Sequence, residues 1–202
     1  MNRKVAKANL LDIKKILDEM KISFWLNTGT LLGAMREKNF IAWDHDVDLR
    51  VKVVDWKNSA QALFKKRGFR CGLVRPPYSE KLPLVKYLRL GRHSHLRFNL
   101  AFTYYYRPDD VYITWAKSPD NIGNLTPAHF YRNDQFIKFL GTSFRVPHDP
   151  VAFLVRVYGK KWKVPIKERI GCWAPKHHIK IDKYLKWFAE HPEEMRFSEG
   201  RP

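Results

Sequence analysis

The chain has 202 residues, of which 45% are hydrophobic and 14% aromatic, and its formal net charge is +18. This length and composition predict a globular protein with one core and exclude a disordered chain. The two cysteines, Cys71 and Cys172, exclude a disulfide framework and a four-cysteine zinc site. The sequence contains neither a signal-peptide core nor 18 consecutive apolar residues, so it predicts a cytoplasmic protein without a transmembrane segment.

The positive charge is concentrated in two parts of the chain. Residues 63–97 carry ten Lys or Arg and one acid, and residues 159–186 carry nine and two. Such clusters attract anions, which leaves open a nucleic acid, an anionic membrane surface and a phosphorylated nucleotide or sugar. A solubilising surface without a partner is a further interpretation.

Apolar spacing and turn residues predict alternating helices and strands. In chain order the elements are a helix (5–20), a strand (22–26), a helix (30–37), a strand (47–54), a helix capped by Asp55 (55–66) and a strand (69–74). They continue with a hairpin of two strands (84–90 and 96–105), a loop-rich segment (107–135), a hairpin around Gly141 (136–146), a helix capped by Asp149 (149–158) and a basic remainder with one helix (178–190). This order predicts an α+β fold with a mixed β-sheet flanked by helices.

Three aspartates occupy every second position at the start of the strand over 47–54, namely Asp44, Asp46 and Asp48. Residues two apart in a strand share a face, so Asp46 and Asp48 lie together, and Asp44 joins them if the strand begins early. Carboxylates about 4 Å apart repel each other by roughly 4 kcal/mol at an effective dielectric near 20. A divalent cation removes this cost, which predicts a site for Mg²⁺ or Mn²⁺.

A turn of small residues precedes the acids and opens the helix over 30–37. Gly29 permits close approach of the backbone, and the first N–H groups of the helix favour a phosphate. Arg36 adds a forked donor. Gly29, Thr30 and Arg36 are therefore the predicted phosphate-binding residues, although an ordinary capped turn is the alternative.

The stretch WLNTGTLLGAMREKNFIAWDHDVDL resembles the signature of the LicD family and its fukutin-like members, which belong to the nucleotidyltransferase-fold superfamily. A second, looser resemblance lies at VPHDPVAFLVRVYGKKWKVP, residues 146–165. The resemblance implies a LicD-like nucleotidyltransferase-fold domain over residues 1–170. The basic remainder, residues 171–202, would be a C-terminal extension with one helix, packed on the domain or appended to it.

The resemblance also implies a transferase. LicD-like enzymes move phosphocholine from CDP-choline, and fukutin-like enzymes move ribitol phosphate from CDP-ribitol, onto a hydroxyl of a glycan or glycolipid. By this likeness Asp46 and Asp48 would hold Mg²⁺ or Mn²⁺ against the donor diphosphate, while Gly29, Thr30 and Arg36 would bind its phosphates.

One position departs from the pattern. The superfamily usually supplies a third carboxylate from a later strand, and the residue that aligns with it here is Asn99. An amide can ligate a metal weakly but cannot act as a general base. Three hypotheses follow: Asp44 supplies the third carboxylate, the metal is weakly held, or the protein binds its donor without turnover. A nucleotidyltransferase fold that acts on or binds nucleic acid is the remaining alternative.

Overall fold

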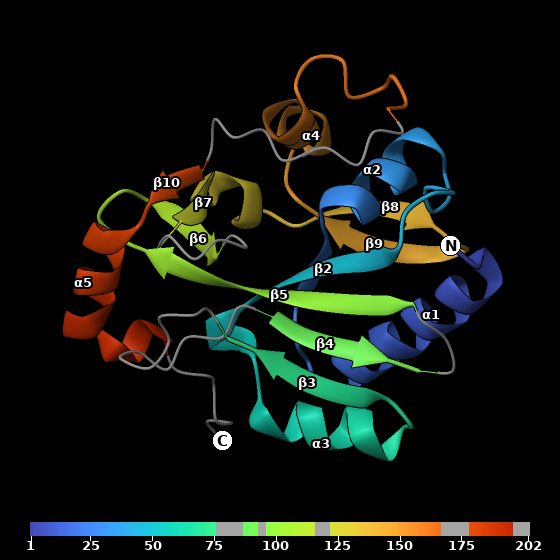
Figure 1. The fold of residues 1–202 in the computed structure, drawn as a ribbon, viewed down its shortest axis with the longest axis horizontal. Helices are drawn as coiled ribbons and strands as arrows, with labels where there is room; N and C mark the ends of the chain where they lie inside the picture. Colours follow the sequence, from blue (N-terminus) through green and yellow to red (C-terminus); the bar gives the residue numbers. More distant parts are fainter. Residues whose placement is uncertain (76–86, 93–95, 116–121, 167–177, 196–202) are drawn as a thin grey trace.

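A computed structural model of the protein describes residues 1–75, 87–92, 96–115, 122–166 and 178–195 (Figure 1). The helices are α1 (Arg3–Glu19), α2 (Thr28–Arg36), α3 (Asn58–Lys66), α4 (Pro150–Tyr158) and α5 (Asp182–Glu190). The strands are β1 (Phe24–Leu26), β2 (Asp46–Lys52), β3 (Arg70–Val74), β4 (Tyr87–Gly91), β5 (Arg97–Tyr106), β6 (Val111–Trp115), β7 (Ile122–Pro127), β8 (Gln135–Phe139), β9 (Thr142–Val146) and β10 (His178–Lys180).

Within these residues the strands form one eight-stranded mixed sheet and the separate hairpin β8–β9. The large sheet runs in the order β1-β2-β5-β6-β7-β10, and β4 joins β3 to β5. Strands β2 and β5 are parallel, whereas the pairings of β1 with β2, β4 with β5 and β5 with β6 are antiparallel. The predicted mixed sheet flanked by helices is therefore the observed fold.

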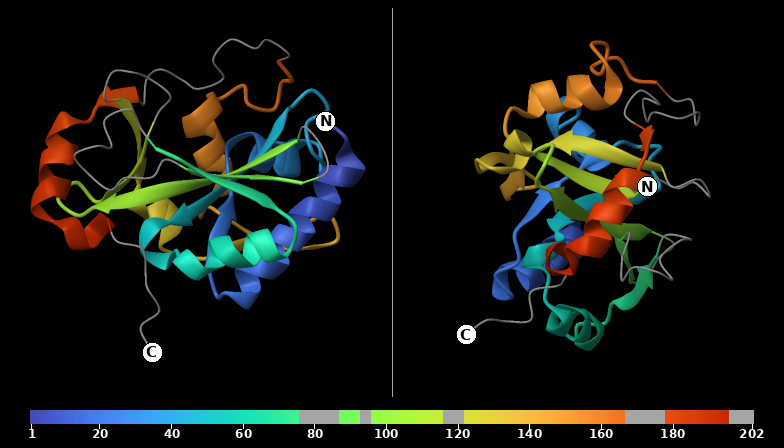
Figure 2. Two further views of the ribbon diagram at one scale, coloured as in Figure 1. Left: turned by 60° about the horizontal axis from the view of Figure 1, so that its bottom comes forward. Right: turned by 90° about the vertical axis from the view of Figure 1, so that its left-hand side faces the viewer.

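The apolar face of the sheet holds most of the core. Val47, Leu49 and Val51 of β2 are fully buried, and so are their register partners in β5, Phe98, Leu100 and Phe102. The helix α1 contributes Leu10, Ile13 and Leu17 to the same core and contacts α3. Helices α2 and α4 lie on the other side of β2 from α3 (Figures 1 and 2). At the start of β2, Asp48 is hydrogen-bonded to Thr28 and Thr30 of α2, so the acidic end of β2 lies against the start of α2.

Two sequence predictions are wrong. The segment 107–135 is not loop-rich, because β6 and β7 lie within it and pair with each other. Its polarity is misleading, since Thr114 and Thr126 are buried between strands.

Asp55 does not cap α3 but ends a 3-10 helix, η1 (Val53–Asp55), and α3 begins three residues later. The intervening Trp56 is buried and packs edge-on against Phe102, which interrupts the helix.

Other local predictions are confirmed. Gly141 has φ +93° in the turn of the β8–β9 hairpin, and the Asp149 side chain accepts a hydrogen bond from the backbone of Ala152 at the start of α4. The predicted C-terminal helix is α5, whose Tyr184 and Phe188 pack against β5. The strand β10 pairs with β7, so this basic segment is joined to the main sheet. None of the helices described has the length and hydropathy needed to cross a membrane.

Candidate functional site

The side chains of Asp46 and Asp48 lie on one face of β2, and parallel pairing with β5 places Asp48 opposite Asn99. The side-chain Nδ2 of Asn99 donates one hydrogen bond to Asp46 Oδ2 at 3.0 Å and another to Asp48 Oδ1 at 3.1 Å. A single amide group therefore joins the two carboxylates. The structure places Asn99 beside the aspartate row, and its role as a ligand stays a prediction.

Asp48 is tied to the N-cap and the first turn of α2 by three hydrogen bonds. The Thr28 hydroxyl donates to Asp48 Oδ2 at 2.7 Å, and the backbone N–H of Asp48 donates to Thr30 Oγ1 at 2.8 Å. The backbone N–H of Asn27 donates to the backbone carbonyl of Asp48 at 3.1 Å. The turn and the acidic strand are therefore one unit. The Thr30 hydroxyl accepts in this contact, so its O–H stays available to donate to another group.

Asp44 and Gly29 also lie against each other. A Cβ added to Gly29 would lie 2.5 Å from Asp44 Oδ2, so the glycine leaves the space that this carboxylate occupies. The other oxygen of Asp44 accepts a hydrogen bond from the backbone N–H of His45 at 2.9 Å. The turn thus contacts two of the three aspartates, Asp44 through Gly29 and Asp48 through Thr28.

The pKa values of Asp44 and Asp48 are raised. Burial and, next, the charge of Asp46 raise the pKa of Asp48 to about 7, against hydrogen bonds from Thr28 and Asn99 that favour its ionised form. Burial and the charge of Asp46 also raise the pKa of Asp44. Without a cation, the site therefore carries more negative charge than its surroundings accommodate.

Oxygen ligands for a hard cation are present, although they are few. In the described part of the chain, no three His, Cys, Asp or Glu side chains are arranged as a metal site. Two carboxylate oxygens do converge on the amide of Asn99, whose own Oδ1 is buried without a hydrogen-bond partner. A half-turn of the amide exchanges its donor for this oxygen. Asp46, Asp48 and Asn99 therefore fit Mg²⁺ or Mn²⁺, both of which prefer oxygen ligands.

The start of α2 has no side-chain cap. Asn27 is the N-cap residue, and it makes no side-chain hydrogen bond to the helix. The first N–H groups of α2 lie at the positive end of the helix dipole, where an anion is stabilised. The space beside Gly29 holds the Asp44 carboxylate, so a phosphate at these amides would lie next to Asp44.

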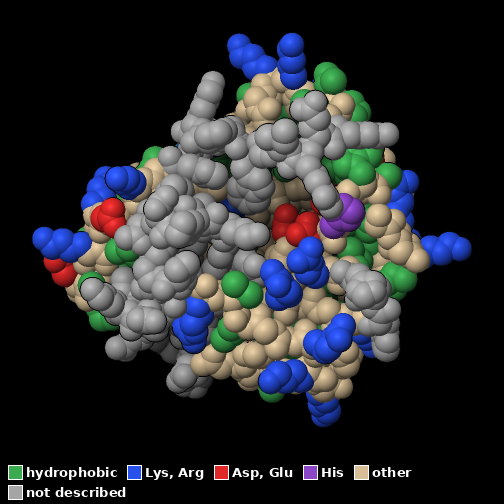
Figure 3. All heavy atoms as spheres, viewed as in Figure 1, with side chains coloured by type: hydrophobic (Ala, Val, Ile, Leu, Met, Phe, Trp, Pro, Cys, Tyr) green, Lys and Arg blue, Asp and Glu red, His purple; other side chains and the backbone are tan. Residues whose placement is uncertain are grey.

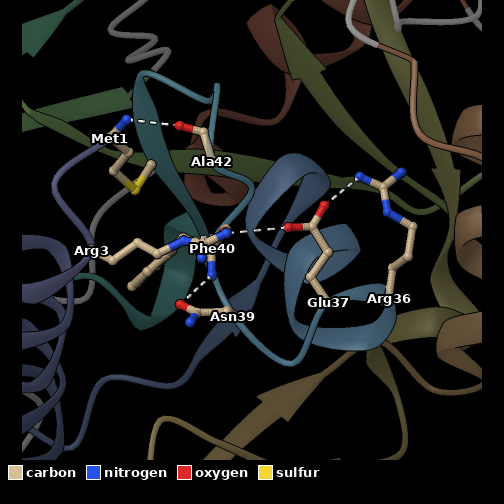
Figure 4. Close-up of polar contacts among 7 residues, drawn as sticks. All are labelled: Met1, Arg3, Arg36, Glu37, Asn39, Phe40 and Ala42. Atoms are coloured by element: carbon tan, nitrogen blue, oxygen red, sulfur yellow. Dashed lines mark hydrogen bonds and ion pairs between the residues drawn. The ribbon is translucent and has the colours of Figure 1, made fainter.

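The structure does not bring Arg36 to this end of α2. Arg36 is the last residue of the helix, and about 10 Å of helix separates it from Gly29 at a rise of 1.5 Å per residue. Its guanidinium donates to Glu37 at 2.8 Å and to the backbone carbonyl of Trp162 at 3.4 Å. Glu37 in turn pairs with Arg3 of α1 at 3.5 Å (Figure 4). In this structure Arg36 thus joins α2 to α1 and to the segment after α4.

Sequence reasoning missed two features of the site. Thr28 is not among the predicted site residues, although a second hydroxyl residue next to Gly29 is a signal of its contact with Asp48. The antiparallel register also places Arg89 of β4 opposite Asn99, which only the strand pairing reveals. Figure 3 shows one group of acidic side chains at the centre of this face with Lys and Arg side chains beside it.

The mixed sheet, the helix opened by a Gly-Thr turn and the paired aspartates of β2 together define a nucleotidyltransferase-type domain. A family model described as "LicD/FKTN/FKRP, nucleotidyltransferase domain" matches residues 21–149. The chain belongs to this family.

Three relatives show how the likeness is distributed. The chain is 29% identical over 169 residues to Ribitol-5-phosphate transferase FKTN of Homo sapiens, covering 82% of this chain and 34% of that protein. It is 28% identical over 149 residues to Ribitol 5-phosphate transferase FKRP of Homo sapiens, covering 71% and 29%. It is 36% identical over 59 residues to Lipopolysaccharide cholinephosphotransferase LicD of Haemophilus influenzae, covering 29% and 22%. The match therefore spans about a third of the length of the FKTN and FKRP proteins.

Proposed function

We propose that this domain transfers a phospho-group, either ribitol phosphate or phosphocholine, from a CDP-activated donor to a hydroxyl of a glycan or glycolipid. The family assignment and the names of the relatives, ribitol-phosphate transferases and a cholinephosphotransferase, support this reaction class. The proposal includes Mg²⁺ or Mn²⁺ as a cofactor bound by Asp46 and Asp48.

The observation that carries the proposal is the convergence of Asp46 Oδ2 and Asp48 Oδ1 on one amide nitrogen, at 3.0 and 3.1 Å. Two carboxylates this close are costly unless a positive group lies between them. The amide N–H groups of Asn99 supply only partial positive charge. A divalent cation that arrives with a nucleotide diphosphate would neutralise the negative charge of the two carboxylates in full. The arrangement therefore favours binding of a nucleotide donor over a purely structural role.

The reaction would proceed at the phosphorus next to the transferred group. The acceptor hydroxyl oxygen forms a bond to this phosphorus, the bond from phosphorus to the bridging oxygen breaks, and CMP leaves with that oxygen. When bound, the cation offsets the charge that develops on the leaving phosphate. The α2 amides at Gly29 and Thr30 orient the diphosphate.

We assign the proton of the acceptor hydroxyl to Asp44. Asn99 cannot accept a proton, whereas Asp44 is a carboxylate whose pKa is raised by burial and by Asp46. A raised pKa makes a carboxylate a better base, since efficiency rises as the pKa approaches the working pH. If Asp44 does not fill this role, a weakly held metal and donor binding without turnover are the two hypotheses that remain.

A thermal-shift panel tests the proposal. A ligand that binds only the folded state raises the melting temperature, so Mn²⁺ with CDP-choline or CDP-ribitol should raise it more than Mn²⁺ or the nucleotide alone. UDP-sugars, nucleoside triphosphates and oligonucleotides complete the panel. Release of CMP in the presence of a glycan acceptor then separates transfer from binding. A shift with oligonucleotides alone would contradict the proposal and favour a nucleic-acid partner.

The exposed acid Asp18 supplies the matched control for this panel. It lies on α1 and pairs with Lys14 at 2.6 Å, remote from the site in sequence and on a solvent-facing helix surface. Asp18→Asn removes one carboxylate as Asp48→Asn does, yet it should keep the full metal-dependent shift. Loss of the shift in Asp48→Asn alone would locate the ligand at the β2 aspartates.

A further inference from the structure

Thr28 has a backbone conformation that its residue type disfavours. Its φ is +37°, and it is 5% exposed. A β-branched residue with positive φ is a genuine outlier, because its side chain crowds the backbone in that region. Such strain persists only where the surroundings hold it, and it is concentrated at functional sites. Gly29, the next residue, would adopt a positive φ freely, yet it is not among the residues with positive φ.

The side chain of Thr28 is hydrogen-bonded to Asp48. The Thr28 hydroxyl donates to Asp48 Oδ2 at 2.7 Å. Two nearby residues fix the backbone of Asp48: the N–H of Asn27 donates to its carbonyl at 3.1 Å, and the Thr30 hydroxyl accepts from its N–H at 2.8 Å. The strained conformation therefore aims a hydroxyl at a carboxylate whose main chain is already held by the same turn.

The two carboxylate oxygens of Asp48 have different hydrogen-bond partners. Oδ2 is occupied by Thr28, whereas Oδ1 is directed at the amide of Asn99, where Asp46 Oδ2 also converges. A carboxylate that accepts a firm hydrogen bond on one oxygen is fixed in rotation about its Cβ–Cγ bond. The oxygen that remains is thereby held toward the point shared with Asp46.

We propose that Thr28 is a positioning residue, whose strained backbone and hydroxyl hold Asp48 in the orientation that binds the divalent cation. The inference rests on the proposed function, since it concerns the cation assigned to Asp46 and Asp48. Partners that orient a ligating carboxylate typically change metal affinity 10- to 100-fold when they are removed. Glycine would relieve the strain at Thr28, but it could not supply the hydroxyl.

Three variants separate the hydroxyl from the strain. Thr28→Val keeps the β-branched shape and loses the hydroxyl, Thr28→Ser keeps the hydroxyl, and Thr28→Gly relieves the backbone and loses the hydroxyl. The readouts are the dissociation constant of Mn²⁺ in the presence of CDP, measured by calorimetry, and the melting temperature without metal. We expect about a tenfold or larger weakening of Mn²⁺ binding in the Val and Gly variants, and a change within about threefold in Ser.

Thr103→Val is the matched control. Thr103 is buried, and its hydroxyl donates to the backbone carbonyl of Ile113 at 3.4 Å. This variant should lower the melting temperature and leave Mn²⁺ binding unchanged. If Thr28→Val and Thr28→Gly likewise lowered only the melting temperature, Thr28 would be a structural residue and the proposal would be wrong.

A double-mutant cycle tests the contact without metal, so its outcome is independent of the proposed cofactor. Thr28→Val should lower the melting temperature clearly in the parent and much less in an Asp48→Ala background, where no carboxylate remains to be held. Equal losses in both backgrounds would overturn the proposal. If the parent binds no Mn²⁺ while the cycle shows coupling, the assignment of the metal fails but Thr28 still orients Asp48.

Discussion

Replacing Asp48 with Asn should stabilise the metal-free protein, although Asp48 is central to the proposed site. The Asn side chain can keep the contact of its oxygen with the Asn99 amide, and its NH₂ group can donate to the Thr28 hydroxyl, which rotates to accept. The change removes a buried negative charge that burial and Asp46 disfavour. A residue of a binding site often lowers the stability of the ligand-free protein, because its surroundings are arranged for the bound ligand.

The magnitude follows from the pKa of Asp48, which rises from an ordinary 3.8 to about 7 on folding. The folded protein therefore holds a proton that the unfolded chain releases, so stability falls as the pH rises from about 4 through about 7. At 1.36 kcal/mol for each pKa unit, the upper limit of this cost at pH 8 is about 4 kcal/mol. We expect Asp48→Asn to recover about 2–4 kcal/mol, or about 5–10 °C in melting temperature for a chain of this length.

Urea denaturation of the parent and of Asp48→Asn, without metal, at pH 4.5 and pH 8 provides the measurement. The variant should be more stable at pH 8, and the difference should shrink at pH 4.5. With Mn²⁺ and CDP-choline present, the order should reverse, because only the parent gains from the ligand. A variant less stable than the parent at both pH values would refute the reasoning, since Asp48 would then be a stabilising carboxylate. Asp18→Asn should show neither effect.

Three further predictions concern the same site. Gly29→Ala should slow transfer and leave the melting temperature close to that of the parent, because the new Cβ displaces only the Asp44 side chain. Its control, Gly33→Ala, should lower the unfolding free energy by about 1–3 kcal/mol, since its Cβ would lie 2.6 Å from a backbone carbonyl. Arg36→Ala should lower the unfolding free energy, measured in urea, by about 1–3 kcal/mol and leave Mn²⁺ binding unchanged. If the variant were instead as stable as the parent and bound CDP-choline more weakly, Arg36 would belong to the phosphate site. Asn99→Asp should lower the melting temperature without metal and tighten Mn²⁺ binding in calorimetry, because it adds an anionic ligand to two carboxylates; looser binding would contradict a ligand role.

The sequence predicts the elements around the site better than those far from it. Alternation of apolar and acidic residues identifies β2, and a Gly and an Asp at turn positions identify the β8–β9 hairpin and α4. The strand β6 was missed because Pro108, Asp109 and Asp110 directly before it indicate a loop, although its own residues, VYITW, favour a strand. The strand β7 was missed because its sequence, IGNLTP, contains Gly, Asn and Pro, which are depleted in strands. Burial between strands is a tertiary property, and local sequence carries little sign of it.

Within the site, the sequence identifies the acids but not the way they are held. Spacing places Asp46 and Asp48 on one face, since that follows from strand geometry alone. The bonds of Thr28 and Thr30 to Asp48 depend on how the turn meets the strand, and no periodicity encodes this. The phosphate role of Arg36 stays a prediction, and the structure shows only that Arg36 is the last residue of α2 and bonds Glu37 and Trp162.

Because position 99 carries an amide, the metal-free site holds less negative charge than a site with three carboxylates would. A third aspartate between Asp46 and Asp48 would face two carboxylate oxygens at about 3 Å and would have to be protonated or paired with a cation for the domain to fold. Asn99 instead donates to both, so the metal-free domain holds its acids in place. The cation must then break two hydrogen bonds and turn the amide before Asn99 can ligate it. The diphosphate of the donor, which ligates the same cation, would offset that cost, so we expect metal and donor to bind this site together rather than separately.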